Sequence, residues 1–393
     1  MTNSSDYFLK PGERRNVLFA LLSSAFIIGV AFGGLAPLLA LVMESRGVST
    51  LLIGLNSAMS PIGVISTTIL TPLLIKRVGA VNTLLLGSAI ILCAILLFPL
   101  FDQLAVWFIL RFIIGIGLAM PWVVSETWLN MATPNSSRGR VMAIYTMVLA
   151  MGFAAGPVIV AWVGSKGAVP YLMYATFVGL STVPIFWVRH MAPAMEVPAH
   201  TKLRGLAAAA PTIFGAAMLS GVTDAATFSF LPLYGLRVGF EESYAVTLLS
   251  LFLAGNLLLQ YPIGWLADHV SRRGMLLFCG AACALGPGLV PFVYEQPYIL
   301  AIVLFIWGGG AWAIYGVALT MLGDRFPAGQ LTAANAAFIM AFETANIIGP
   351  PASGYAINLW APHGLMFLLA AIGALFFALT AGRGIIRRLG KRA

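Results

Sequence analysis

The stretch Pro262–Gly274, PIGWLADHVSRRG, is one of the few dense clusters of charge in a 393-residue chain of which only 9% is Asp, Glu, Lys or Arg. Apolar runs flank it on both sides, at 243–267 and 274–293. A helix needs about 20 apolar residues to cross a bilayer, and both runs are long enough. The stretch is therefore predicted to be a polar turn that joins two transmembrane helices.

Ten further apolar runs lie along the chain, which is 60% hydrophobic. Such a composition over this length indicates an integral membrane protein. The twelve runs together predict an all-α membrane fold with twelve transmembrane helices. The other ten runs are 17–43, 50–75, 81–101, 104–130, 140–164, 168–189, 206–233, 297–323, 331–358 and 361–386.

The positions of Lys and Arg predict the orientation of these helices. All but four of the 22 basic residues lie in the termini or in every second loop, the exceptions being Arg46, Arg111, Lys166 and Arg237. Basic loops stay in the cytoplasm. Both termini are therefore expected there, in a multi-pass protein of the bacterial cytoplasmic (inner) membrane. Topology also explains the net charge of +9, and no nucleic-acid partner is expected.

The interior stretch 189–205 is the least hydrophobic and separates six runs from six. It is predicted to be a cytoplasmic linker between a six-helix half at 1–188 and a second half at 206–393. The halves match in one frame when the first is shifted by 193 residues. A repeat of two six-helix halves is typical of transporters. The matching residues are Gly115 and Gly308, Gly117 and Gly310, Pro134 and Pro327, Ala143 and Ala336, and Gly156-Pro157 and Gly349-Pro350.

Three short sequence motifs lie within these two halves. They are Gly264, Asp268, Arg272 and Arg273 after the eighth run; Arg111, Gly115 and Gly117 in the fourth; and Gly152, Gly156 and Pro157 in the fifth. Through them the chain resembles the major facilitator superfamily (MFS) along nearly its whole length. The third motif resembles that of the drug–proton antiporter branch, although Val160 and Ala161 stand where that branch has a glycine pair. The resemblance implies two six-helix pseudo-repeats with a substrate site between them.

The resemblance also implies a conformational latch at the opening stretch. Asp268, with Gly264, Arg272 and Arg273, would meet the start of the fifth run, which carries Arg138 and Arg140, and so close the cytoplasmic side. In the first-half copy of the motif, PLLIKRVGA, Lys76 takes the place of the acid, so only Asp268 can act in this way. The alternative interpretation is local charge that fixes topology and forms the turn.

The third motif has a direct physical interpretation. Small residues four apart, such as Gly152 and Gly156, let helices approach closely. Pro157 would bend the same helix. The motif is expected to pack helices against one another.

Four ionisable residues fall inside apolar runs: Arg111, Glu126, Asp224 and Glu343. Each costs about 2.5–3.5 kcal/mol on insertion scales unless it is paired or faces a water-filled cavity. Asp224 and Glu343 lie near the midpoints of their runs, so they are the candidates for proton coupling, with Glu126 as a further one. The alternative is a structural ion pair or hydrogen bonds to neighbouring polar groups.

A substrate cavity is expected between the helices. Arg111, Trp122 and Glu126 share one face of the fourth run, and several polar or aromatic residues of later runs are its other candidates. The aromatic ones could equally pack or anchor at an interface. The later candidates are Asn256, Gln260, Trp312 and Tyr315.

These observations favour a secondary transporter that moves a small organic solute by alternating access, coupled to protons and directed outward. Import of a nutrient or metabolite is the alternative. The solute, protons and the lipid bilayer are the expected partners of a monomer. An enzyme is not expected, since HExxH and GxSxG are absent, and a sensor would carry an appended soluble domain. No cofactor or metal is expected; Cys93, Cys279 and Cys283 are interpreted as packing residues.

Overall fold

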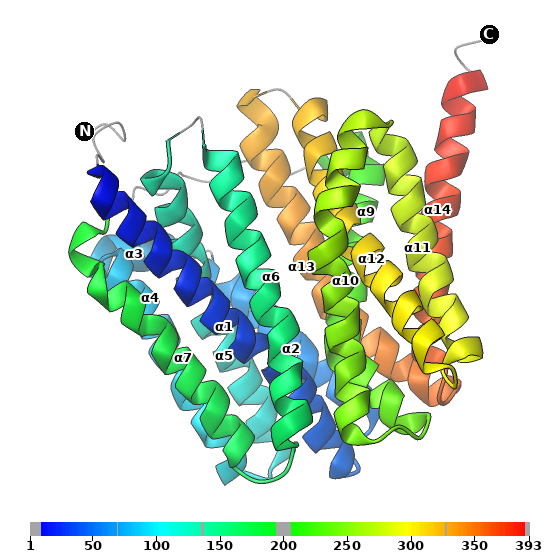
Figure 1. Ribbon diagram of the computed structural model, residues 1–393, viewed down its shortest axis with the longest axis horizontal. Coiled ribbons are helices and arrows are strands. Elements are labelled where there is room, and N and C mark those ends of the chain that lie inside the picture. The colour runs from blue at the N-terminus through cyan, green and yellow to red at the C-terminus, as the bar shows by residue number, and fades with distance from the viewer. Residues whose placement is uncertain (1–8, 69, 135–136, 194–205, 327, 390–393) are drawn as a thin grey trace. The chain divides into compact units, whose positions relative to one another are not determined.

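The computed structural model describes residues 9–68, 70–134, 137–193, 206–326 and 328–389, with the side chains of 72, 138, 139, 143, 206–207, 268, 328–333 and 383–389 left out. Every predicted apolar run in it is helical (Figure 1). The helices are α1 (Pro11–Ser45), α2 (Thr50–Thr68), α3 (Thr71–Val78), α4 (Ala80–Leu97), η1 (Phe98–Leu100), α5 (Leu104–Ala132), α6 (Arg138–Val163), α7 (Val169–Trp187), η2 (Arg189–Met191), α8 (Leu206–Ala209), α9 (Pro211–Arg237), α10 (Glu242–His269), α11 (Arg272–Val293), α12 (Pro297–Arg325), α13 (Ala328–Leu359) and α14 (Gly364–Leu389).

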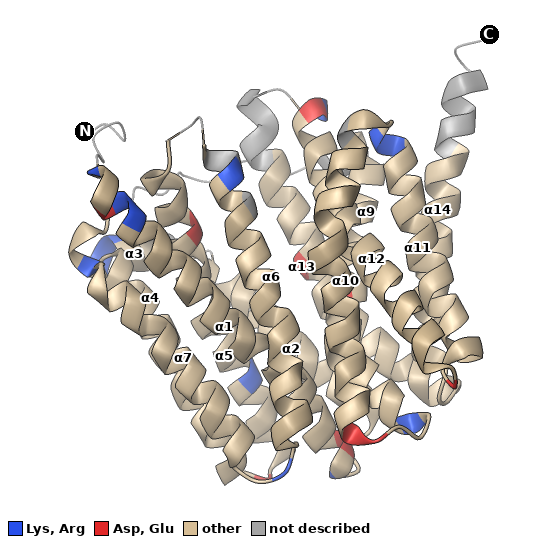
Figure 2. Cartoon of the chain, viewed as in Figure 1, with Lys and Arg blue, Asp and Glu red and all other residues tan. Residues whose placement is uncertain are grey.

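Twelve of the described helices have 18 residues or more, which confirms the predicted all-α architecture. Eleven of them are long and apolar enough to cross a membrane. The twelfth, α13, has 32 residues but is more polar, with Glu343, Asn346 and Asn358 among them. Most charged residues gather towards the helix ends, and a few lie in the middles of helices (Figure 2).

One predicted run is divided in the structure. The run 50–75 forms α2 and the separate eight-residue helix α3. Pro72 lies in the first turn of α3, where proline is favoured because its missing N–H is not needed. The prediction of one continuous span over 50–75 was therefore wrong, because α2 ends at Thr68.

By its contacts the chain forms two compact units. Unit 1 is Met1–Leu38 with Met59–Ala199, and unit 2 is Leu39–Ala58 with His200–Ala393. The segment Leu39–Ala58, which ends α1 and begins α2, therefore packs with the second unit. Each helix carries a proline close to the point of division, Pro37 in α1 and Pro61 in α2. The division into halves at 1–188 and 206–393 stays a prediction.

Glycines set the closest helix contacts of unit 1. Gly115 of α5 lies against the carbonyl oxygen of Ser60 in α2, and Gly63 of α2 lies against that of Phe112 in α5. A Cβ on either glycine would collide with backbone. The two helices therefore cross with their main chains in contact, an approach that only the smallest residues permit.

The same contacts recur in unit 2. Gly308 of α12 lies against the carbonyl oxygen of Phe252 in α10, and Gly255 of α10 lies against that of Phe305 in α12. The α5 and α12 positions are related by the predicted shift of 193 residues, whereas the α2 and α10 positions are related by 192. The internal repeat is thus confirmed in the packing. The shift that relates its two copies is one residue shorter for α2 and α10 than for α5 and α12.

The cysteines differ in their surroundings. Cys279 and Cys283 are buried, as expected of packing residues, but Cys93 is exposed. The packing interpretation was wrong for Cys93 because it lies off the buried stripe of α4, which passes through Gly87, Ile91 and Ala94.

Candidate functional site

Two carboxylates lie in the same region of unit 2. Asp224 lies near the middle of α9 and Glu343 near the middle of α13. Gly221, one turn before Asp224, lies against the backbone carbonyl of Phe342, the residue next to Glu343. This close approach brings the acids near enough for their charges to interact.

Neither acid is neutralised by a described basic residue. The Oδ1 atom of Asp224 is buried and has no hydrogen-bond partner in the described part of the chain. The Oε2 atom of Glu343 accepts a hydrogen bond from Asn346 Nδ2 at 3.5 Å. No Lys or Arg among the described residues forms an ion pair with either carboxylate. Two like charges in one half-buried site are unfavourable, and uptake of one proton removes that repulsion.

Helix α12 completes this site. Ser220 of α9 donates a hydrogen bond to the carbonyl of Ala311 at 3.2 Å, immediately before Trp312. Tyr315 packs against the ring of Phe342, with 5.2 Å between centroids. The indole Nε1 of Trp312 is buried without a partner among the described groups. The structure thus places Trp312 and Tyr315 on the helix that borders the acid pair.

Asn256 and Gln260 lie on α10, whose glycine contacts are with α12. Asn256 is 1% exposed, and its Oδ1 has no partner among the described atoms. Neither side chain forms a described hydrogen bond with Asp224 or Glu343. The structure therefore buries Asn256 and leaves Gln260 half-buried, and it joins neither directly to the acids.

The three predicted cavity residues of α5 lie at two separate places along the helix. Trp122 Nε1 donates a hydrogen bond to Glu126 Oε1 at 2.7 Å, so these two share a face as predicted. Arg111 is 7% exposed, its carbonyl accepts from Ser60 Oγ at 3.1 Å, and its Nε is buried without a described partner. Fifteen residues separate Arg111 from Glu126, or about 22 Å along a helix. The two charges cannot pair with each other directly.

A small cavity in unit 1 was not predicted. Its volume is about 110 Å³ and it reaches Trp122, the hydrogen-bond partner of Glu126. Its polar lining comes from one residue on each of five helices. None of these residues belongs to a sequence motif that would have predicted the cavity. These residues are Ser24, Ser88, Ser125, Tyr145 and Ser181.

A comparison with protein families decides the affiliation. The family model of the Major Facilitator Superfamily matches residues 21–251 and again 213–386. The chain belongs to the Major Facilitator Superfamily. The two matches begin 192 residues apart, which agrees with the repeat seen in the packing.

Relatives in the MFS are named as transporters. The chain is 27% identical to the uncharacterized MFS-type transporter YfkF of Bacillus subtilis (strain 168), over 93% of this chain and 95% of the relative. It is 25% identical to the uncharacterized MFS-type transporter YcaD of Shigella flexneri, over 91% and 93%. These names support membrane transport, rather than catalysis, as the activity of this chain.

Solved MFS structures share the fold. A mutant of the nucleoside transporter NupG superposes with a TM-score of 0.78 at 13% identity, covering 93% of this chain and 99% of that one. A bacterial homologue of the human lysosomal transporter Spinster gives 0.74 at 15% identity, with coverage of 95% and 98%. A D-xylose–proton symporter gives 0.71 at 16% identity, with coverage of 92% and 97%.

The residues of the predicted MFS latch lie at the ends of helices. The side chains of Asp268 and Arg138 are outside the described residues. Arg272 forms an ion pair with Asp324 of α12, and Arg273 donates to the carbonyl of Thr380 in α14. Both observed partners belong to unit 2. Arg140 is exposed, and Gly264 has open space around it.

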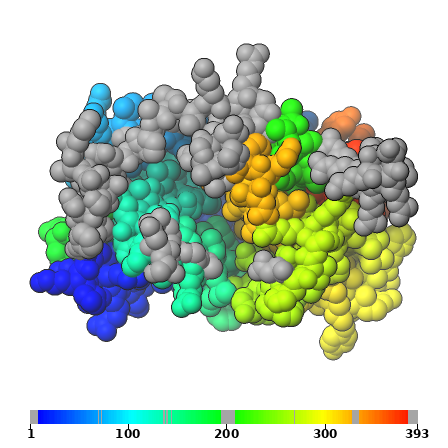
Figure 3. Space-filling model, turned by 90° about the horizontal axis from the view of Figure 1, so that it is seen from above, coloured from blue at the N-terminus to red at the C-terminus, as the bar shows by residue number. Residues whose placement is uncertain are grey.

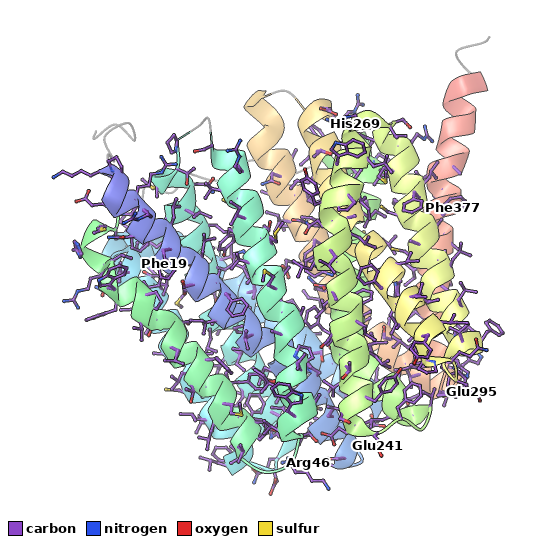
Figure 4. The ribbon with its side chains drawn as sticks, in the orientation of Figure 1. Phe19, Arg46, Glu241, His269, Glu295 and Phe377 are labelled. Carbon is purple, nitrogen blue, oxygen red and sulfur yellow. The ribbon has the colours of Figure 1, made fainter. Side chains whose placement is uncertain are left out.

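The α10–α11 turn itself lies on the face of unit 2 seen in Figure 3. His269, at the end of α10, marks this face, and Arg46, Glu241 and Glu295 lie at the opposite end of unit 2 (Figure 4). Charged residues lie at both ends of unit 2 (Figure 2), as expected of a bundle whose middle lies in lipid.

The predicted packing motif forms a backbone contact within unit 1. Gly152 lies against the carbonyl of Phe26 in α1, and Gly156 lies against Val30 and Gly34. The hydroxyl of Tyr174 in α7 donates to the carbonyl of Gly156 at 2.9 Å. The motif therefore occupies a contact where three helices meet.

Proposed function

We propose that this MFS member is a secondary active transporter that moves a small organic solute by alternating access and uses a proton gradient to do so. The observation that carries the proposal is the Asp224–Glu343 pair, two half-buried carboxylates near the middle of α9 and α13 that form no ion pair with a described Lys or Arg. We propose that the pair holds the coupling proton, with Glu126 as a further candidate site.

The physical reason is the cost of charge in a bilayer. An unpaired charge at mid-depth costs about 2.5–3.5 kcal/mol on insertion scales, so two adjacent carboxylates favour binding of a proton. In alternating access, water reaches such a site from one side and then from the other. A proton taken up on one side and released on the other couples its gradient to movement of the solute.

Outward transport is the direction we favour. It is supported by Gly152, Gly156 and Pro157, which resemble the motif of the drug–proton antiporter branch. Import of a nutrient or metabolite is the second candidate, because one structural neighbour is named as a D-xylose–proton symporter. We further propose a monomer in the bacterial cytoplasmic membrane with both termini in the cytoplasm.

Closure on the cytoplasmic side is assigned to Asp268. Its carboxylate would accept hydrogen bonds from the exposed amides at the start of α6. Asp268→Asn is then expected to shift the equilibrium towards the inward-open state. Labelling of a cysteine placed near the cytoplasmic helix ends measures this shift, and unchanged labelling would reduce the motif to a topology signal.

Proteoliposomes test the proton coupling. A solute is first selected by thermal-shift screening of the purified protein against metabolites and drugs across pH. Asp224→Asn and Glu343→Gln should each abolish accumulation driven by a pH gradient while leaving exchange of labelled for unlabelled solute. Glu295→Gln, which changes an exposed carboxylate at a helix end, is the matched control. Full gradient-driven accumulation by both variants would overturn the proposal.

A further inference from the structure

The cavity of unit 1 contains hydroxyls that the protein itself leaves unsatisfied. Ser24, Ser88 and Ser125 are 8%, 2% and 8% exposed, and none has a hydrogen bond with another described group. Serines inside helices often donate to a carbonyl of the preceding turn, as Ser181 does to Val178 at 2.7 Å. Buried hydroxyls that do not do so are expected to bond with water or a ligand.

A carboxylate lies next to two residues that line this cavity. Glu126 accepts from the indole of Trp122, which lines the cavity, and its charge acts on the hydroxyl of Tyr145, which lines it as well. No Lys or Arg among the described residues forms an ion pair with Glu126. The cavity thus offers several oxygen acceptors and an indole side chain, with one negative charge beside them.

The remaining wall is apolar. Ile28, Phe32, Leu118, Leu149 and Phe153 provide it. A cavity of about 150 Å³ holds a benzene ring, so the present volume of about 110 Å³ fits a smaller group. An ammonium group with a few carbon atoms meets all three conditions: it has three N–H donors, a positive charge and a small apolar stem.

We propose that this cavity binds the amine-bearing end of the transported solute, with Glu126 as its counter-ion. This assignment rests on the proposed transport function, because it takes the bound amine to be part of the transported solute. The ammonium would donate to Glu126 and to the hydroxyls of Ser125 and Tyr145, and its charge would gain from the indole of Trp122. The substrate class is therefore organic cations with a primary amine rather than neutral polyols.

Binding to the purified full-length protein in detergent tests the assignment without a membrane or a gradient. The probe is ethylamine, a cation at pH 7, and its neutral comparison is ethanol. Ligand-dependent rises in Tm give apparent Kd values. We expect ethylamine to stabilise the protein more than ethanol, and Glu126→Gln to weaken the amine by about tenfold or more.

Two further variants keep the test decisive. Ser125→Leu fills the cavity and should remove stabilisation by the amine even if Glu126→Gln folds poorly. Glu295→Gln removes a negative charge outside the cavity and should leave amine binding unchanged. Equal stabilisation by amine and alcohol, or wild-type amine binding in Glu126→Gln or Ser125→Leu, would overturn the assignment.

The two proposals fail in different ways. Amine binding without solute movement in proteoliposomes would refute transport and leave the site in place. Proton-driven transport of another solute, without amine binding, would refute the site and leave the transport function.

Discussion

Arg237 donates two hydrogen bonds to a single carboxylate oxygen of Glu44, from Nε at 2.9 Å and from Nη2 at 2.8 Å. Glu44 lies near the end of α1 and Arg237 ends α9. The same segment, Leu39–Ala58, makes further contacts in unit 2. Thr50 donates to the carbonyl of Gly354 at 2.8 Å, and Ser229 donates to Ser57 at 3.0 Å. The segment is thus tied to α9 and α13 by one ion pair and several hydrogen bonds.

Loss of Arg237 should destabilise this segment. The other carboxylate oxygen of Glu44 is buried without a described partner, so Arg237→Ala would leave an uncompensated acid and cost about 1–3 kcal/mol. Exchange of the charges, Glu44→Arg with Arg237→Glu, should restore part of the loss. Thermal unfolding in detergent measures both effects. Additive destabilisation in the exchanged double variant would show that the pair contributes no stability of its own.

The glycine contact of α12 should tolerate no side chain. Gly308→Ala places a methyl group against the carbonyl of Phe252 and is expected to cost about 1–3 kcal/mol by overpacking. Gly316→Ala is the matched control on the same helix, because open space surrounds that position. It should gain up to about 1 kcal/mol in helix propensity. A Tm for Gly308→Ala equal to that of the control would contradict the contact.

Arg111 should be required for transport but not for folding. Its guanidinium is buried and has an unsatisfied Nε in the described structure, which points to a charged partner during the cycle. Arg111→Ala is expected to lower the initial rate of solute uptake by about tenfold or more, as loss of one charged hydrogen bond of about 1.5–3 kcal/mol would. Size-exclusion profiles check folding, and Lys166→Ala, at an exposed position, is the control. Normal uptake would place Arg111 outside the mechanism.

His363 should make stability depend on pH. It lies between α13 and α14, where its Nδ1 is 3.1 Å from the hydroxyl of Tyr234, and partial burial lowers the pKa of its imidazole. The unfolded chain therefore binds a proton more readily than the folded one, so stability is complete above about pH 6.5 and falls as the pH drops through the lowered pKa. His363→Asn should flatten the decline of Tm between about pH 7 and 5, whereas His190→Asn, at an exposed position, should not. An unchanged slope in His363→Asn would assign the decline to other groups.

Local features of the site were predictable, but contacts between distant segments were not. Trp122 and Glu126 meet because residues four apart share a helix face, which the sequence alone can reveal. Asp224 and Glu343 could be named because each is an acid in an apolar run. Their proximity depends on the close crossing of α9 and α13 at Gly221, which no periodicity records.

The serine cavity was missed for a related reason. Ser24, Ser88 and Ser125 come from three helices, and a single serine in an apolar run is a weak signal. Only the fold brings them together. The bond between Glu44 and Arg237 was equally hidden, because 193 positions separate the two residues in the sequence.

The mirrored glycine contacts of α2 with α5 and of α10 with α12 carry a consequence for the ancestry of the chain. A duplicated ancestor could change its side chains freely wherever a Cβ has room, and the copies have done so: Lys76 stands where the second copy has Asp268. At Gly115 and Gly308 no such drift was possible, because backbone fills the space. The likeness of the two halves is therefore preserved at positions that carry no side chain.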